Sequence, residues 1–147
     1  MAVIIEKIID HSADNIYAQV KHNKNMVHAY IVGPIRDIAN MINEEIMVEI
    51  GFDKINSWSE IKNFNDNNSG MKEDNPTSIR IAGRVHNAVV LDDGAVLLDL
   101  YLMNGADFLT IQSKDIGDHI PKEGSGLEIV VGKLLLYPTN LEVNTTH

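Results

Sequence analysis

Hydrophobic and polar residues alternate along several short segments, a pattern typical of β-strands that bury one face. The segments "NIYAQVK" (15–21), "MVHAYIV" (26–32) and "AVLLDLYLM" (95–103) each place an apolar residue at every second position. The segment "DFLTIQS" (107–113) predicts a further short strand. The pattern therefore predicts a protein that is mainly β.

Turn residues between these segments predict hairpins. The polar, Asn-rich "HNKN" (22–25) joins the first two strands. Asp93-Gly94 stands between "VVL" and "AVLL", and Asp-Gly favours a two-residue hairpin turn because both central residues of that turn need positive φ. A further turn is expected at Asn104-Gly105.

A related phrase occurs twice, as "RDIANMI" (36–42) and "KDIGDHI" (114–120). Each has Ile residues at helical spacing and predicts one or two helical turns that cover an apolar edge. Each is followed by a strand-like run, "EEIMVEIGF" (44–52) and "GLEIVVGKLLLY" (126–137). An internal repeat is one interpretation, and a single larger β domain is the other.

The segment "NFNDNNSGMKEDNP" (63–76) is poor in large apolar residues and reads as a linker or exposed loop. It divides the chain into an N-terminal β unit (1–62) and a C-terminal β unit (77–147). On each side the expected order is three strands, a short helix and a further strand.

This element order resembles the OB-fold, a small Greek-key barrel, most clearly over 78–138 and less regularly over 2–60. The resemblance implies one or two small barrels, each with a short helix between strands three and four. It also implies ligand binding on the face of strands two and three, where members of the fold take oligonucleotides, oligosaccharides or proteins. The fold does not choose among these ligands.

Composition narrows the class of partner. The chain has 147 residues with 12 basic and 21 acidic side chains, a net charge of −9. Such a surface repels duplex DNA and anionic membranes at long range and attracts a basic protein. The chain lacks cysteine, and no apolar run approaches the roughly 20 residues that span a bilayer. A cytoplasmic protein is expected.

The sequence lacks the motifs of common catalytic and cofactor-binding sites. It does not contain the residue spacing of a phosphate-binding loop, of a dinucleotide-binding fingerprint or of a nucleophile elbow. His22 and His28 flank a predicted hairpin, and together with Asp14 they could hold a divalent metal ion. The two histidines are, however, expected to be exposed hairpin residues. Asp99 and Glu49 are expected to be solvated strand residues. No catalytic residue, metal or cofactor is predicted.

One constellation fits a ligand. In "SIRIAGRVH" (78–86), inward Ile79, Ile81 and Val85 leave Arg80, Arg84 and His86 facing outward. Bases stack on aromatic side chains, and the candidates are Tyr17, Tyr30, Tyr101 and Phe108. Two arginines and two of these aromatic residues form the candidate ligand-binding set. The set is Arg80, Arg84, Tyr101 and Phe108.

The sequence thus leads first to a non-catalytic binding protein that acts through protein–protein interaction, such as an acidic inhibitor or immunity-type protein for a basic partner. The alternative is an OB-like module that binds single-stranded nucleic acid or oligosaccharide, although the net charge disfavours nucleic acid. Open sheet edges favour self-association, so a homo-oligomer is a further option. No membrane partner is expected.

Overall fold

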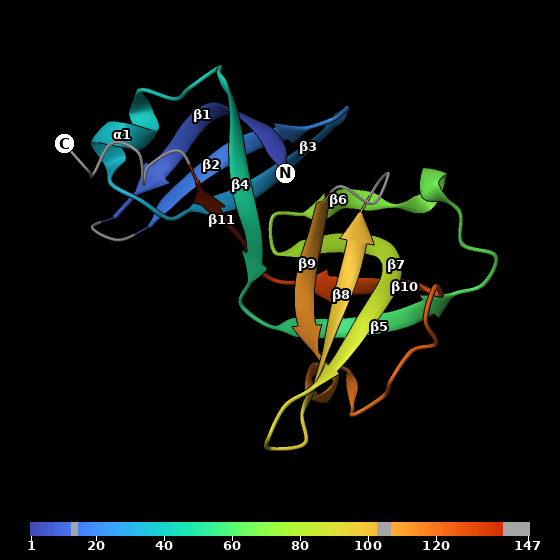
Figure 1. Ribbon diagram of the computed structural model, residues 1–147. Coiled ribbons are helices and arrows are strands. Elements are labelled where there is room, and N and C mark those ends of the chain that lie inside the picture. The colour runs from blue at the N-terminus through green and yellow to red at the C-terminus, as the bar shows by residue number, and fades with distance from the viewer. Residues whose placement is uncertain (13–14, 103–106, 140–147) are drawn as a thin grey trace.

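The computed structural model describes residues 1–12, 15–102 and 107–139, and it is mainly β as the sequence predicts. Five strands close a barrel and six form a neighbouring sheet (Figure 1). None of the helices in the described part of the chain is long and apolar enough to span a membrane.

The closed barrel takes four strands from the N-terminal part of the chain and one from the end of the described region. They are β1 (Ala2–His11), β2 (Ile16–His22), β3 (Asn25–Ile31), β4 (Glu45–Phe52) and β11 (Leu134–Pro138). Their order around the barrel is β1-β2-β3-β11-β4, and β4 returns to β1. Strand β11 runs parallel to β3 and antiparallel to β4.

A very short helix, α1 (Ile35–Ala39), lies between β3 and β4. It is the first of the two helical segments that the sequence predicts. Its Ile38 is fully buried, and Met41 just beyond its end also joins the core. The helix therefore covers apolar side chains at one end of the barrel (Figure 1), and its five residues are long enough for this role.

The second sheet has the order β5-β10-β7-β8-β9, with β6 paired to β7. Its strands are β5 (Ile55–Ile61), β6 (Gly70–Asn75), β7 (Ser78–Val90), β8 (Val96–Leu102), β9 (Asp107–Gln112) and β10 (Gly126–Val131). The 13-residue β7 pairs with β10 through its first half and with β8 through its second half, so it connects the two sides of this sheet.

The two β structures exchange strands. Strand β5 follows the barrel strand β4 directly but pairs with β10 in the second sheet, whereas β11 follows β10 and completes the barrel. The two crossing connections are hydrogen-bonded to each other. The backbone N–H of Asp53 donates to the carbonyl of Lys133 (3.2 Å), and the N–H of Lys133 donates to Asp53 Oδ1 (3.0 Å).

The segment 63–76, predicted as a linker or exposed loop, contains a 3-10 turn, η1 (Asp66–Asn68), and strand β6. Asn65 caps the turn through its side chain, which accepts from the N–H of Asn67. Strand β6 forms because the edge of β7 offers it unpaired backbone groups. The other helical phrase becomes η2 (Ser113–Ile116), and its Ile116 is fully buried.

The first prediction concerns Gly83, at the point where β7 changes partners. A Cβ atom at this position would overlap the backbone carbonyl of Tyr101. Gly83→Ala is expected to lower the free energy of unfolding by about 1–3 kcal/mol, the usual cost of overpacking. The matched control is Gly132→Ala, whose Cβ would meet its nearest atoms at 3.4 Å and whose effect should stay within about 0.5 kcal/mol. Urea denaturation measures both, and equal effects would contradict this account of Gly83.

Candidate functional site

Three of the four residues predicted from sequence lie in one row on the outer face of the second sheet. Arg84 on β7 is the cross-strand partner of Tyr101 on β8, and Tyr101 is the partner of Phe108 on β9. The three side chains share a face because residues in register across neighbouring strands point the same way. We call Arg84, Tyr101 and Phe108 the aromatic row.

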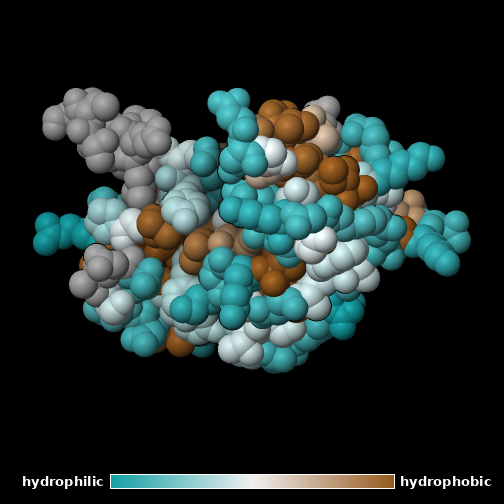
Figure 2. Space-filling view, turned by 90° about the horizontal axis from the view of Figure 1, so that it is seen from below, coloured by the Kyte–Doolittle hydropathy of each residue, from teal (hydrophilic) through white to brown (hydrophobic). Residues whose placement is uncertain are grey.

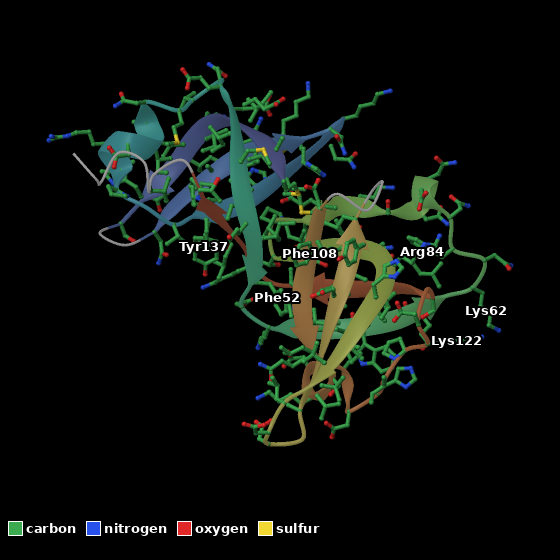
Figure 3. All side chains as sticks on the ribbon, viewed as in Figure 1. Phe52, Lys62, Arg84, Phe108, Lys122 and Tyr137 are labelled. Carbon is green, nitrogen blue, oxygen red and sulfur yellow. The ribbon has the colours of Figure 1, made fainter. Side chains whose placement is uncertain are left out.

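The rings of the row are in contact. Tyr101 stacks against Phe108 with ring centroids 5.4 Å apart, and on its other side it meets the edge of His86 at 5.0 Å. Phe108 is 50% exposed, an unusual state for a ring of this size. Figure 3 shows Phe108 and Arg84 on the same side of the sheet. The row therefore presents aromatic surface to a ligand.

The Arg84 side chain is held in place from several directions. Its guanidinium carbon lies 5.0 Å from the centroid of the Phe64 ring. Its Nη1 donates to the carbonyl of Gly124 (2.8 Å), and its Nη2 lies 3.8 Å from Asp66 Oδ1. The Phe64 ring packs directly on Gly126, where a Cβ atom would overlap it. The cation is thus fixed beside the aromatic rings before any ligand arrives.

Arg80, the fourth predicted residue, is not part of the row. Its Nε donates to Asp74 Oδ2 (2.6 Å), and its Nη1 lies 3.9 Å from Glu128. The hydrogen bond that Arg80 donates to Asp74 and the negative charges of Asp74 and Glu128 raise the pKa of Arg80. It lines a separate polar depression of ≈ 430 Å³ together with Lys72. Arg80 therefore binds neighbouring carboxylates and does not contact the aromatic row.

Further residues lie beside the aromatic row. His86, predicted from sequence to face outward with the arginines, contacts Tyr101. Phe64, Lys62 and Lys122 were not predicted: Phe64 contacts Arg84, and both lysines lie on the same side of the molecule as Arg84 (Figure 3). Phe64 stands in a polar, Asn-rich segment, and a lone aromatic residue in such surroundings is the one signal that pointed to it. The lysines follow no pattern that predicts their position.

The barrel carries a comparable set of rings on β2 and β3. Tyr17 lies 5.0 Å from Tyr30 and stacks on His28 at 5.5 Å between centroids. This face is partly covered, because Glu73 of β6 accepts hydrogen bonds from the backbone N–H of His28 (2.8 Å) and bonds to its ring Nδ1. Lys133 lies over the Tyr30 ring at 5.3 Å. Strand β6 of the second sheet thus covers part of the aromatic face of the barrel. The aromatic row of the second sheet, by contrast, is open at Phe108.

The histidines weighed as metal ligands point to different partners. His22 is buried, and its Nδ1 lies 3.2 Å from the carbonyl oxygen of Ala2, whereas His28 bonds to Glu73. Asp14 lies outside the described residues. Among the residues that the structure describes, no group of three His, Cys, Asp or Glu side chains is arranged to hold a metal ion.

Comparison with known proteins adds no further information about the site. No protein-family model matches the chain, and neither a similar curated protein nor a similar solved structure was found. The interpretation of the aromatic row therefore rests on its geometry.

The second prediction concerns Tyr17. Its pKa is raised above 10.0, first by burial and then by the negative charges of Glu73 and of ionised Tyr30. The ionised form is disfavoured in the folded state, so Tyr17 contributes stability that is full below the unfolded pKa and is lost as pH rises through the folded one. Glu73→Gln removes one negative charge and should lower this pKa, but not to 10.0, because the burial remains. The pKa of Tyr17 is measured by tyrosinate absorbance during a pH titration, and Tyr17→Phe identifies the part of the absorbance that belongs to Tyr17. An unchanged titration in Glu73→Gln would show that Glu73 does not affect the pKa of Tyr17.

Proposed function

We propose that the protein is a non-catalytic binding protein built from two OB-like units, and that the aromatic row of the second unit binds single-stranded nucleic acid. The observation that carries the proposal is the register of Arg84, Tyr101 and Phe108 across three neighbouring strands.

The barrel order supports an OB-like unit. Strands β1, β2, β3 and β4 with α1 before β4 supply the first four strands and the helix, and β11 takes the fifth place between β3 and β4. This out-of-sequence insertion is the Greek-key feature of the fold. In the second sheet, β7, β8, β9, η2 and β10 follow the same succession, and β5 lies beside β10 as a fifth strand.

The repeated phrase supports two related units. Ile38 in the first phrase and Ile116 in the second are both fully buried, and each lies in the helical segment that precedes the fourth strand of its unit. In this proposal the two units have exchanged their fifth strands, β5 and β11, at the crossing of Asp53 and Lys133. The phrase recurs because each unit needs the same apolar closure.

The chemistry of the row favours single-stranded nucleic acid. Unpaired bases stack on aromatic rings with about 1–3 kcal/mol per base, and a fixed cation meets the phosphates. On the proposed OB-like unit, β8 and β9 are strands two and three, the usual binding face. The net charge of −9 opposes this ligand. At physiological salt, however, the Debye length is about 8 Å, so distant carboxylates act weakly on a phosphate beside Arg84.

The third prediction tests the row directly. A fluorescent oligothymidylate of about 12 nucleotides is titrated with the protein at low salt, and anisotropy reports binding. Phe108→Ala should weaken binding roughly 5- to 150-fold, which corresponds to one lost base stack. Tyr137→Ala on β11 is the matched control, an aromatic side chain of similar exposure on the barrel, and should leave affinity unchanged.

Two further ligands complete this experiment. Duplex DNA of the same length should bind more weakly, because its bases are not free to stack. A neutral oligosaccharide, followed by competition with the labelled strand, should not compete. Binding of the oligosaccharide with loss on Phe108→Ala, together with no oligothymidylate binding, would contradict the nucleic-acid assignment and favour a carbohydrate ligand.

The fourth prediction concerns the cation. Each phosphate contact to a single strand contributes about −0.7 to the slope of log K against log salt. Arg84→Gln removes the positive charge and also the hydrogen bond from Nη1 to the Gly124 carbonyl, but keeps a polar side chain at this position. The slope should become less steep by about 0.7. A parallel shift of the line without a change in slope would mean that Arg84 has only a structural role.

The proposed binding role implies that the protein has no catalytic activity. A cytoplasmic location is proposed from the sequence. An interaction with a basic protein, the first hypothesis from the sequence, is proposed for a different surface.

A further inference from the structure

The tip of the hairpin formed by β7 and β8 carries a cluster of exposed apolar side chains. Val89, Val90 and Leu91 are 54%, 70% and 37% exposed, and they follow one another in the chain. Single exposed apolar residues are common on protein surfaces, but a contiguous group marks an interaction site. These side chains add little to the protein's own core, so their exposure needs another explanation.

The hairpin holds this cluster in a defined position. The N–H of Leu91 donates to the carbonyl of Ala95 (2.7 Å), and the N–H of Gly94 donates to the carbonyl of Leu91 (2.9 Å). Asp93 Oδ1 accepts from the N–H of Ala95 (3.0 Å). Gly94 has a positive φ of 87°, but Asp93 does not have positive φ, so the turn is not the two-residue type predicted from Asp-Gly. An apolar group on an ordered support loses little conformational entropy on binding, which makes it a suitable anchor.

The start of η2 lies beside the base of the hairpin. The N–H of Val96, at that base, donates to Ser113 Oγ (3.3 Å), which places η2 beside β8. The chain then reaches β5, where His119 stacks on Trp58 and bonds to Glu60. Figure 2, which views the molecule from this end, shows hydrophobic side chains gathered at the surface among hydrophilic ones. We call Val89, Val90 and Leu91 the apolar tip.

Carboxylates adjoin the apolar tip. The exposed Asp92 and Asp93 follow Leu91 directly in the turn, and the neighbouring η2 segment contributes the exposed Asp115 and Asp118. In 89–94 and 113–120, Lys114 is the cation opposed to these four acids, and His119 bonds to Glu60 (2.6 Å). Counting His119 as neutral, the charge of these two segments is four negative against one positive. The apolar tip is therefore joined to an acidic turn and lies near an acidic segment.

The charges near the apolar tip indicate which kind of partner would bind there. A second copy of this chain would bring its own four carboxylates to the same place, and like charges across an interface are unfavourable. An anionic lipid surface is repelled for the same reason. A protein surface with an apolar pocket edged by Lys or Arg complements both the apolar tip and the carboxylates next to it, because interfaces combine an apolar core with a polar edge. We propose that the apolar tip docks into such a basic groove of a partner protein, independently of the aromatic row.

The fifth prediction uses a defined probe. An amphipathic peptide that alternates Arg or Lys with Leu is titrated into ¹⁵N-labelled protein, and a charge-reversed peptide with Glu in place of Arg and Lys is the parallel control. Amide shifts should change in 89–94 and 113–120 with the basic peptide and not with the acidic one. Val90→Ser should weaken binding at least tenfold, because it removes the most exposed anchor.

Two matched variants separate the parts of the surface. Ile9→Ser removes an exposed apolar side chain of β1 and should leave peptide affinity unchanged. Asp92→Asn with Asp118→Asn should weaken binding at low salt and flatten its salt dependence, because long-range attraction is reduced. Asn suits position 118, where φ is 60°. Oligothymidylate affinity should be the same for Val90→Ser and for the unaltered protein.

Three results would overturn the proposal. The first is the absence of basic-peptide shifts in these segments. The second is a dimer in sedimentation experiments that Val90→Ser dissociates, since this would assign the apolar tip to a second copy. The third is binding to vesicles of phosphatidylserine or phosphatidylcholine that depends on Val90, which would assign it to a membrane surface.

Discussion

The insertion of β11 between β3 and β4 is the constraint on which the rest of the structure depends. Without this strand, β3 and β4 would face each other with unpaired backbone groups, and the barrel would lose Leu134 and Leu136, which are both fully buried. This strand is the last in the described chain, and all the strands of the second sheet precede it in the sequence. Closure of the barrel therefore requires the second sheet, and the two structures are expected to unfold together.

The same exchange supports the aromatic row. Strand β5 leaves the barrel at Asp53 and pairs along β10, which directs the chain after Ile61 across the outer face of the sheet. Phe64 then rests on Gly126 and holds the guanidinium of Arg84. A sequence of contacts thus connects the crossing point with the candidate site. Asp66 of the same segment also lies beside Arg84, whereas Asn67 and Asn68 line the depression that contains Arg80.

The alternating strands and their hairpins could be predicted, because burial of one face imposes a period of two that the sequence displays directly. The same argument placed Arg80 and Arg84 on the outer face of one strand, but the alignment of Arg84 with Tyr101 and Phe108 depends on the pairing register of three strands. Strand β1 shows no such period, since two irregularities in its pairing, between Ile5 and Lys7 and between Ile8 and Asp10, shift the side chains. The pattern "VIIEKIID" is consequently ambiguous in sequence.

Other elements depend on distant partners and were not predictable. Strand β6 carries Lys72, Glu73 and Asp74 in succession and has no apolar alternation, yet it pairs because β7 presents a free edge. Most of β5 is exposed on both faces, so its sequence does not indicate a strand beside β10. The exchange of β5 and β11 is a matter of pairing between remote segments, and a single sequence does not encode such pairings in any local pattern.

The two proposed surfaces make opposite electrostatic demands on one acidic protein, and their separation explains how both can be met. Arg84 and Val90 lie on the same strand, β7, six positions apart, which at about 3.3 Å per residue is roughly 20 Å. This distance exceeds the Debye length of about 8 Å at physiological salt more than twofold. The carboxylates around the apolar tip therefore exert little repulsion on a phosphate at the aromatic row. Because the two surfaces are joined by an ordered strand, a nucleic acid and a basic protein bound there would be held at a fixed spacing.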